Sequence, residues 1–151
     1  MEHVAIMKKE WNLTQKIIEG IKTVESRWYK FRIAPWNKIH LGDTIYFKDT
    51  GSCVSVKASV TKVEQHEIVD NIQAVELMSK NALADLGTTD LSNSIRDYIK
   101  DKKYAIFIHI NNVEKITPFD IDKTGFGMQC AWLSVSNISA IKIKNSAKQS
   151  G

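Results

Sequence analysis

The sequence is poor in residues that hold metals or form disulfides. It contains only two cysteines, Cys53 and Cys130, and they stand far apart. Cysteine-ligated zinc sites and redox-active dithiols need closely spaced cysteines, so both of these classes are excluded, and we interpret the two residues as packed or bystander thiols. The four histidines are equally scattered, at positions 3, 40, 66 and 109. We therefore expect neither a bound metal nor a cofactor.

Long apolar runs are absent as well. No stretch approaches the roughly 18 apolar residues that cross a bilayer, and charged residues interrupt the first ten positions, where a secretory signal needs an unbroken apolar segment. We expect a cytoplasmic protein without membrane contact. The 151 residues are 43% hydrophobic and 25% charged, which is the balance of one folded domain and not of a disordered chain.

Common signatures of chemistry are also missing. The chain has no GxxxxGK[ST] phosphate loop, no GxGxxG after a strand and no GxSxG nucleophile turn. The charge excess is small, because 21 Lys and Arg residues against 17 Asp and Glu residues give a net charge of +4. This excess permits an anionic partner without identifying one.

Strands are predicted where β-branched and aromatic residues concentrate or alternate with polar ones. These segments are residues 4–6, 23–29, 44–48, 54–63, 104–110, a short piece around 113, 132–135 and 138–143. Beyond Val60 the apolar parity shifts to Val63, which predicts a bulge or a strong bend. Such a bend favours a curved sheet.

Three helices are predicted from apolar residues at helical spacing. The first follows Asn12, whose spacing to Gln15 is typical of a capping box, and ends at Gly20. The second ends at Gly87 and contains the apolar positions 72, 75, 78, 82, 83 and 86. The third is shorter and contains residues 95–99. Together with the strands, they predict an α+β fold in which a curved mixed sheet or β-barrel carries flanking helices.

One domain is expected over residues 1–144, followed by a flexible C-terminal tail over residues 145–151. Within that domain the segment 20–29 differs from the rest, because it places a lysine, a glutamate, an arginine and two aromatic residues between a helix end and a strand. Glu25 and Arg27 share one face of the strand by its period of two, whereas Lys22 joins them only if the chain twists near Thr23. The plainer alternative is a solvated edge strand with one surface ion pair, worth about 0 to 1 kcal/mol.

The pattern Gly20-x-Lys22-x-x-Glu25-x-Arg27 resembles the GxKxxExR signature of the ASCH domain, a branch of the PUA-like superfamily. The resemblance extends over most of the chain. A Gly-Asp turn precedes a strand, a valine-rich strand follows, and a helical insertion leads to a return strand near Tyr104. The resemblance implies a PUA-like β-barrel with a cleft lined by the signature residues.

The resemblance also implies a range of functions. Members of the family are associated with RNA or nucleic-acid binding, transcriptional coactivation and translation, some small bacterial members hydrolyse acetylated cytidine, and others are linked to RNA cleavage. In the amidohydrolases the catalytic lysine corresponds to Lys22, but the position of their nucleophilic threonine is Glu25 here, with Thr23 as the neighbouring hydroxyl. Their acidic partner comes from the region after the valine-rich strand, where the candidates are Glu64, Glu67 and Glu76.

The residue types themselves suit a nucleotide. Lys22 and Arg27 attract phosphate, and Glu25 can accept from a base amino group or hold Arg27. Aromatic side chains can stack a base, and the candidates are Trp28, Tyr29 and Trp36; packing in the core is the alternative for both tryptophans. The loop 118–128, which contains Lys123 and two glycines, can approach a phosphate or merely connect two strands.

We therefore expect a module that binds RNA or another nucleic acid, a modified nucleotide included, through a cleft lined by Lys22, Glu25 and Arg27. The alternative is a small amidohydrolase acting on acylated nucleosides, or a ribonuclease, with Lys22 as base and Glu25 or Thr23 assisting. Protein partners that bind the barrel surface form a third class.

Overall fold

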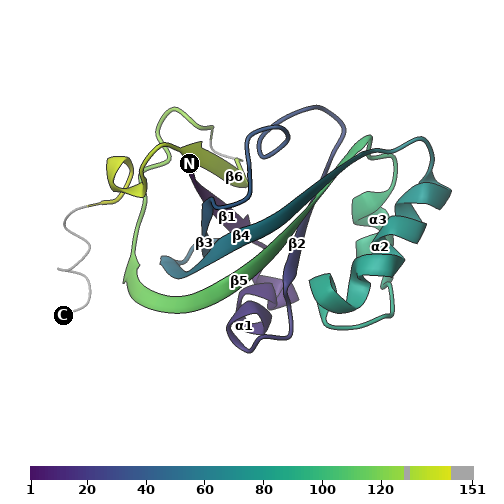
Figure 1. Ribbon diagram of the computed structural model, residues 1–151, viewed down its shortest axis with the longest axis horizontal. Helices are drawn as coiled ribbons and strands as arrows, with labels where there is room; N and C mark the ends of the chain where they lie inside the picture. The colour runs from purple at the N-terminus through teal and green to yellow at the C-terminus, as the bar shows by residue number, and fades with distance from the viewer. Residues whose placement is uncertain (128–129, 144–151) are drawn as a thin grey trace.

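One mixed sheet organises the chain in the computed structural model, which describes residues 1–127 and 130–143 (Figure 1). Its strands are β1 (Glu2–Met7), β2 (Val24–Tyr29), β3 (Thr44–Asp49), β4 (Val54–Glu67), β5 (Tyr104–Phe119) and β6 (Trp132–Val135). The helices are α1 (Leu13–Ile18), α2 (Asn71–Leu86) and α3 (Asn93–Ile99), with short 3-10 turns η1 (Lys9–Trp11) and η2 (Ile138–Ala140). The tail predicted over residues 145–151 lies outside the described residues.

The strand order is β2-β5-β4-β3-β1-β6, so β2 and β6 are the edges and the sheet is an open half-barrel. Only β1 and β3 run parallel among these neighbours; the other pairs are antiparallel. The long strands β4 and β5 curve strongly, and their register shifts between Val60 and Lys62, where the bulge was predicted (Figure 1). The predicted α+β class with a curved mixed sheet is confirmed.

Three local predictions are wrong for identifiable reasons. β5 is one continuous strand through Phe119, because pairing with β4 overrides the exposed polar residues that broke its apolar pattern. Residues 138–143 do not form a strand: Asn137 accepts from the Ser139 N–H and starts η2 instead. Asn12 has a left-handed φ of 54° and makes no side-chain cap, because η1 already ends there.

Two clusters of core side chains flank β2. On one side α2 and α3 pack against the sheet through Trp28, Phe107 and Met78. On the other side α1 packs through Ile17 in a cluster that includes Phe47. Of the apolar positions that predicted α2, Ile72 and Leu83 are exposed at 71% and 62%, since only part of that helix surface meets the sheet. None of the helices that the structure describes is long and apolar enough to cross a membrane.

Candidate functional site

The turn before β2 directs Lys22 toward the strand's own carboxylate. Gly20 has a φ of 77°, and the N–H groups of Ile21 and Lys22 both donate to the carbonyl of Lys16, at 3.0 and 3.1 Å. The chain then enters β2 with the Thr23 N–H on the carbonyl of Ala84. The chain therefore twists near Thr23, which is the condition under which Lys22 joins Glu25, and the Lys22 side chain lies beside the Glu25 carboxylate.

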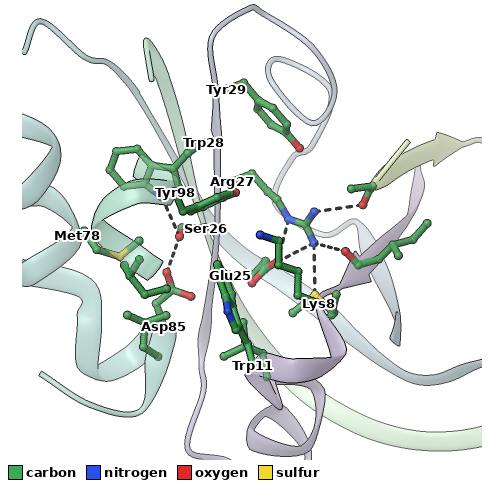
Figure 2. A pocket seen from close by; sticks show the side chains of 16 residues that line it. Lys8, Trp11, Glu25, Ser26, Arg27, Trp28, Tyr29, Met78, Asp85 and Tyr98 are labelled. Carbon is green, nitrogen blue, oxygen red and sulfur yellow. Dashed lines mark hydrogen bonds and ion pairs between the residues drawn. The ribbon is translucent and has the colours of Figure 1, made fainter. Parts of the chain in front are cut away.

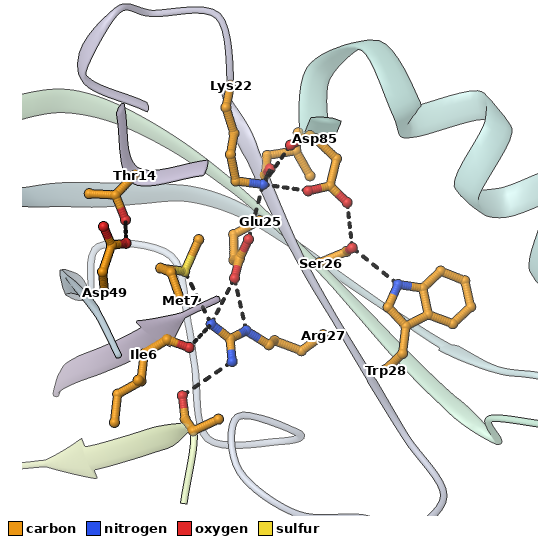
Figure 3. A network of polar contacts seen from close by, with 12 residues as sticks. Ile6, Met7, Thr14, Lys22, Glu25, Ser26, Arg27, Trp28, Asp49 and Asp85 are labelled. Atoms are coloured by element: carbon orange, nitrogen blue, oxygen red, sulfur yellow. Dashed lines mark hydrogen bonds and ion pairs between the residues drawn. The ribbon is translucent and has the colours of Figure 1, made fainter. Parts of the chain in front are cut away.

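The ammonium of Lys22 is fully buried and surrounded by acceptors (Figure 3). Its Nζ lies 3.0 Å from Glu25 Oε1, 2.5 Å from the carbonyl of Val24 and 2.7 Å from the carbonyl of Asp85. It also forms an ion pair with the Asp85 carboxylate. An ammonium has three N–H groups, so these contacts engage all of its donors.

Arg27 extends the network to β1. Its Nε and Nη2 both lie 2.8 Å from Glu25 Oε2, and Nη1 donates to the carbonyl of Ala131 at 3.1 Å. The remaining contacts of Nη2 are the carbonyl of Ile6 and the Sδ of Met7, both at 3.3 Å. The guanidinium therefore ties β2 to β1 and to the segment that precedes β6.

Asp85 closes the network from α2. Its second oxygen accepts from the Ser26 hydroxyl, which in turn accepts from the Trp28 indole N–H at 3.1 Å. Among the described residues no buried side-chain nitrogen or oxygen lacks a hydrogen-bond partner. The interpretation of β2 as a solvated edge strand with one surface ion pair is therefore wrong, because Glu25 and Arg27 are only 4% and 6% exposed.

The charges of the network follow from its geometry. Burial lowers the pKa of Lys22, but the carboxylates of Asp85 and Glu25 outweigh it and hold that pKa above its ordinary value. Burial raises the pKa of Glu25, yet Lys22 and Arg27 bring it below the ordinary range. For Asp85 burial dominates, with Glu25 adding to it, and its pKa is raised. Lys22 is thus firmly protonated, which is the opposite of what a catalytic base requires.

A cavity of about 190 Å³ follows the outer edge of β2 (Figure 2). All five residues from Glu25 to Tyr29 line it. Since successive side chains alternate between the two faces of a strand, such a cavity must lie along the free edge. The opposite walls come from Lys8 and Trp11 beyond β1, Met78 and Asp85 of α2, and Ile95 and Tyr98 of α3. Lys22 does not line the cavity; it lies behind the two carboxylates.

The aromatic wall of this cavity consists of Trp11 from η1, Tyr29 from β2 and Tyr98 from α3. Trp11 and Tyr98 meet edge to face with centroids 5.6 Å apart. Burial raises the pKa of Tyr98 to about 12 and also raises that of Tyr29, so both phenols stay neutral. The cavity therefore offers neutral rings beside a buried arginine and two carboxylates.

The other residues predicted for the site lie outside the cavity, except Trp28. Thr23 is exposed and lies outside the cavity lining. Trp28 lines the cavity but is only 1% exposed and packs edge-on against Phe107, so its main contacts are those of a core residue. Trp36 packs on Tyr104 at 5.0 Å, away from the cavity. Lys123 lines a separate hollow formed by the loop residues 122–125 and 127.

A second carboxylate contacts Lys22 besides that of Glu25; it belongs to Asp85, which the sequence reasoning missed. Of the three candidates proposed for this partner, Glu64 contacts His109 at 3.0 Å, Glu67 pairs with an arginine on the surface, and Glu76 is exposed. A signal was present, because an aspartate at position 85 falls on the apolar face of α2 next to its buried residues. Within the described part of the chain, no group of three or more His, Cys, Asp or Glu side chains could hold a metal.

Comparisons with known proteins give a fold relationship. No family model matches the chain, and no curated protein matches it. A crystal structure of a point mutant of the ASCH protein from Zymomonas mobilis superposes with a TM-score of 0.66 and 20% identity over 92% of this chain and 93% of that one. A further structure of ASCH from Zymomonas mobilis gives 0.63 and 20% over 90% and 88%. The chain therefore has the ASCH fold, a PUA-like α+β half-barrel, as its signature predicted.

Proposed function

We propose that this protein binds RNA or another nucleic acid by receiving one base in the cavity along β2. The cavity itself is the main support, because a pocket of about 190 Å³ is smaller than the roughly 300–1,000 Å³ typical of larger ligands and suits a single ring system. Its aromatic wall, with Trp11 and Tyr98, offers faces on which a base can stack, a contact worth about 1 to 3 kcal/mol.

The polar groups along β2 suit the edge of a base. The carbonyl of Thr23 pairs with β5 and that of Val24 points the other way, to Lys22, so by alternation the N–H and carbonyl of Ser26 point away from β5 along the free edge. They supply one donor and one acceptor. Glu25 supplies a further acceptor for a base amino group, and Arg27 holds that carboxylate in place through two contacts with its Oε2. Lys22 acts on the ligand indirectly, by holding the carboxylates in place.

The same geometry argues against hydrolysis as the main activity. Lys22 is protonated and its donors are engaged, Thr23 lies outside the cavity, and Glu25 stands where a hydroxyl nucleophile would be needed. A lysine in this state positions carboxylates and does not accept a proton from an attacking group. Binding without turnover of acylated nucleosides or RNA is therefore the expected behaviour.

The test is a binding series with product analysis. Purified protein is titrated with labelled single-stranded RNA, with free nucleosides and with acetylated cytidine, and every sample is examined by mass spectrometry. The blocking variant is Ala131→Trp, since Ala131 is exposed, lines the cavity and uses only its main chain in the network. The matched control is Ala140→Trp, at an exposed position in η2.

We expect wild type and Ala140→Trp to bind RNA equally and Ala131→Trp to bind at least about tenfold more weakly, because the indole occupies the space of the base. Equal binding by all three proteins would show that RNA does not bind in the cavity. Absence of RNA and nucleoside binding, or conversion of either substrate, would overturn the proposal.

A further inference from the structure

Lysines from separate segments meet at one ring beside the cavity. Lys8, beyond β1, has its Nζ 5.4 Å from the centroid of the Tyr98 ring, and Lys102, beyond α3, has its Nζ at the same distance. Lys8 also lies 4.5 Å from the centroid of Trp11. Both aromatic residues line the cavity, so the two ammonium groups stand at its aromatic wall.

A third lysine joins them through the backbone. The Lys103 N–H donates to the carbonyl of Tyr29 at 2.9 Å, so the residues following β2 lie beside those preceding β5. This contact brings Lys30 near Lys102. Burial lowers the pKa of Lys102, and the positive charges of Lys30 and Lys8 lower it further, as expected for three neighbouring cations.

These three lysines differ from Lys22 and Arg27 in their partners. Among the described residues, none of Lys8, Lys30 and Lys102 forms an ion pair with a carboxylate, whereas Lys22 and Arg27 inside the network both do. Like charges held together repel one another, and a bound anion relieves that repulsion. The three lysines lie beside a cavity whose volume suits one base. An anion that is attached to that base would therefore lie close to them.

We infer that Lys8, Lys30 and Lys102 form a phosphate subsite that adjoins the base cavity, so that the ligand is a phosphorylated nucleotide unit and not a free nucleoside. This inference rests on the proposed function, because the base in the cavity brings the phosphate to the lysines. Lys8 connects the two subsites, since it lines the cavity and also belongs to the lysine group. Flexible ammonium groups supply charge without fixed geometry, which suits a phosphate carried on a mobile sugar.

The experiment compares matched ligands on the full chain. Isothermal titration measures the affinity of one nucleoside, of its 5′-monophosphate and its 3′-monophosphate, and of a short single-stranded RNA of the same base. The variant is Lys30→Gln with Lys102→Gln, which leaves every residue of the cavity lining in place. The control is Lys80→Gln with Lys115→Gln, because both of those lysines are exposed and lie away from the cavity lining.

In the wild type and the control, we expect at least one monophosphate to bind about tenfold more tightly than the nucleoside. In the double variant this advantage falls to about twofold or less. If RNA alone shows the gain, the subsite reads an internal phosphodiester, and the salt dependence of RNA binding must then weaken in the variant.

The subsite is overturned if nucleosides bind but phosphate adds nothing in the wild type, or if the double variant retains the full advantage. Either result leaves the base cavity in place. Failure of nucleosides, nucleotides and RNA alike to bind would instead overturn the proposed function. The two failures are thus distinguishable within one titration series.

Discussion

Replacing Lys22 with methionine removes the cation on which two buried carboxylates depend. Methionine fills a similar volume, so the main loss is electrostatic: Glu25 and Asp85, only 4% and 2% exposed, keep their positions without the ammonium. Removing one partner of a buried ion pair costs about 3 to 5 kcal/mol. For a chain of this size, that loss lowers the melting temperature by roughly 6 to 20 °C.

The assay is urea unfolding at pH 8 and pH 5, followed by circular dichroism, with the exposed Lys80→Met as control. Without the ammonium, the pKa values of Glu25 and Asp85 rise in the folded state, so the folded form binds protons more tightly than the unfolded form. The Lys22→Met deficit must therefore shrink as the pH falls. A deficit below about 1 kcal/mol at pH 8, or one that grows at pH 5, would refute the reasoning.

Two further outcomes follow from single positions. Gly87→Ala lowers the free energy of unfolding by about 1 to 2 kcal/mol, because φ at this position is +74° and the new Cβ would lie 2.8 Å from Ile21 Cγ2. Urea unfolding should show that adding Ile21→Ala recovers part of this loss. Burial lowers the pKa of His3 despite its contact with Asp43, so the folded protein loses stability as the pH falls below about 6.5, the pKa of an unfolded histidine. In His3→Gln, unfolding curves from pH 7 to pH 5 should show a smaller loss. A slope that persists in His3→Gln would assign the loss to another group.

The class of fold could be predicted from the sequence because the residues that indicate each helix, strand or bulge lie close together along the chain. The glycine at position 87 ends α2 with a positive φ, and the parity shift after Val60 marks the bulge in β4. Errors arose where a neighbouring element decided the outcome. The continuity of β5 depends on its ladder with β4, and the entry to α1 depends on η1, neither of which is visible in a short window of residues.

Only part of the candidate site could be predicted from the sequence. Glu25 and Arg27 could be paired by the period of a strand, because both lie in one element. Asp85 could not be assigned to Lys22, since about sixty residues and a change of element separate them, and the pairing is decided by how α2 docks on β2. The lysine group near Tyr98 was missed for the same reason: Lys8 and Lys102 come from segments that meet only in the folded chain.

The position of β2 at the open edge of the sheet also bears on whether the strand of another chain can pair with it. An uncovered edge strand offers a row of main-chain donors and acceptors to any other chain. Here Lys22 occupies the carbonyl of Val24, and the buried charges of Glu25 and Arg27 would lose their partners if a foreign strand displaced the surrounding walls. The ion-pair network that shapes the cavity along β2 thus also opposes the addition of a foreign strand at this edge.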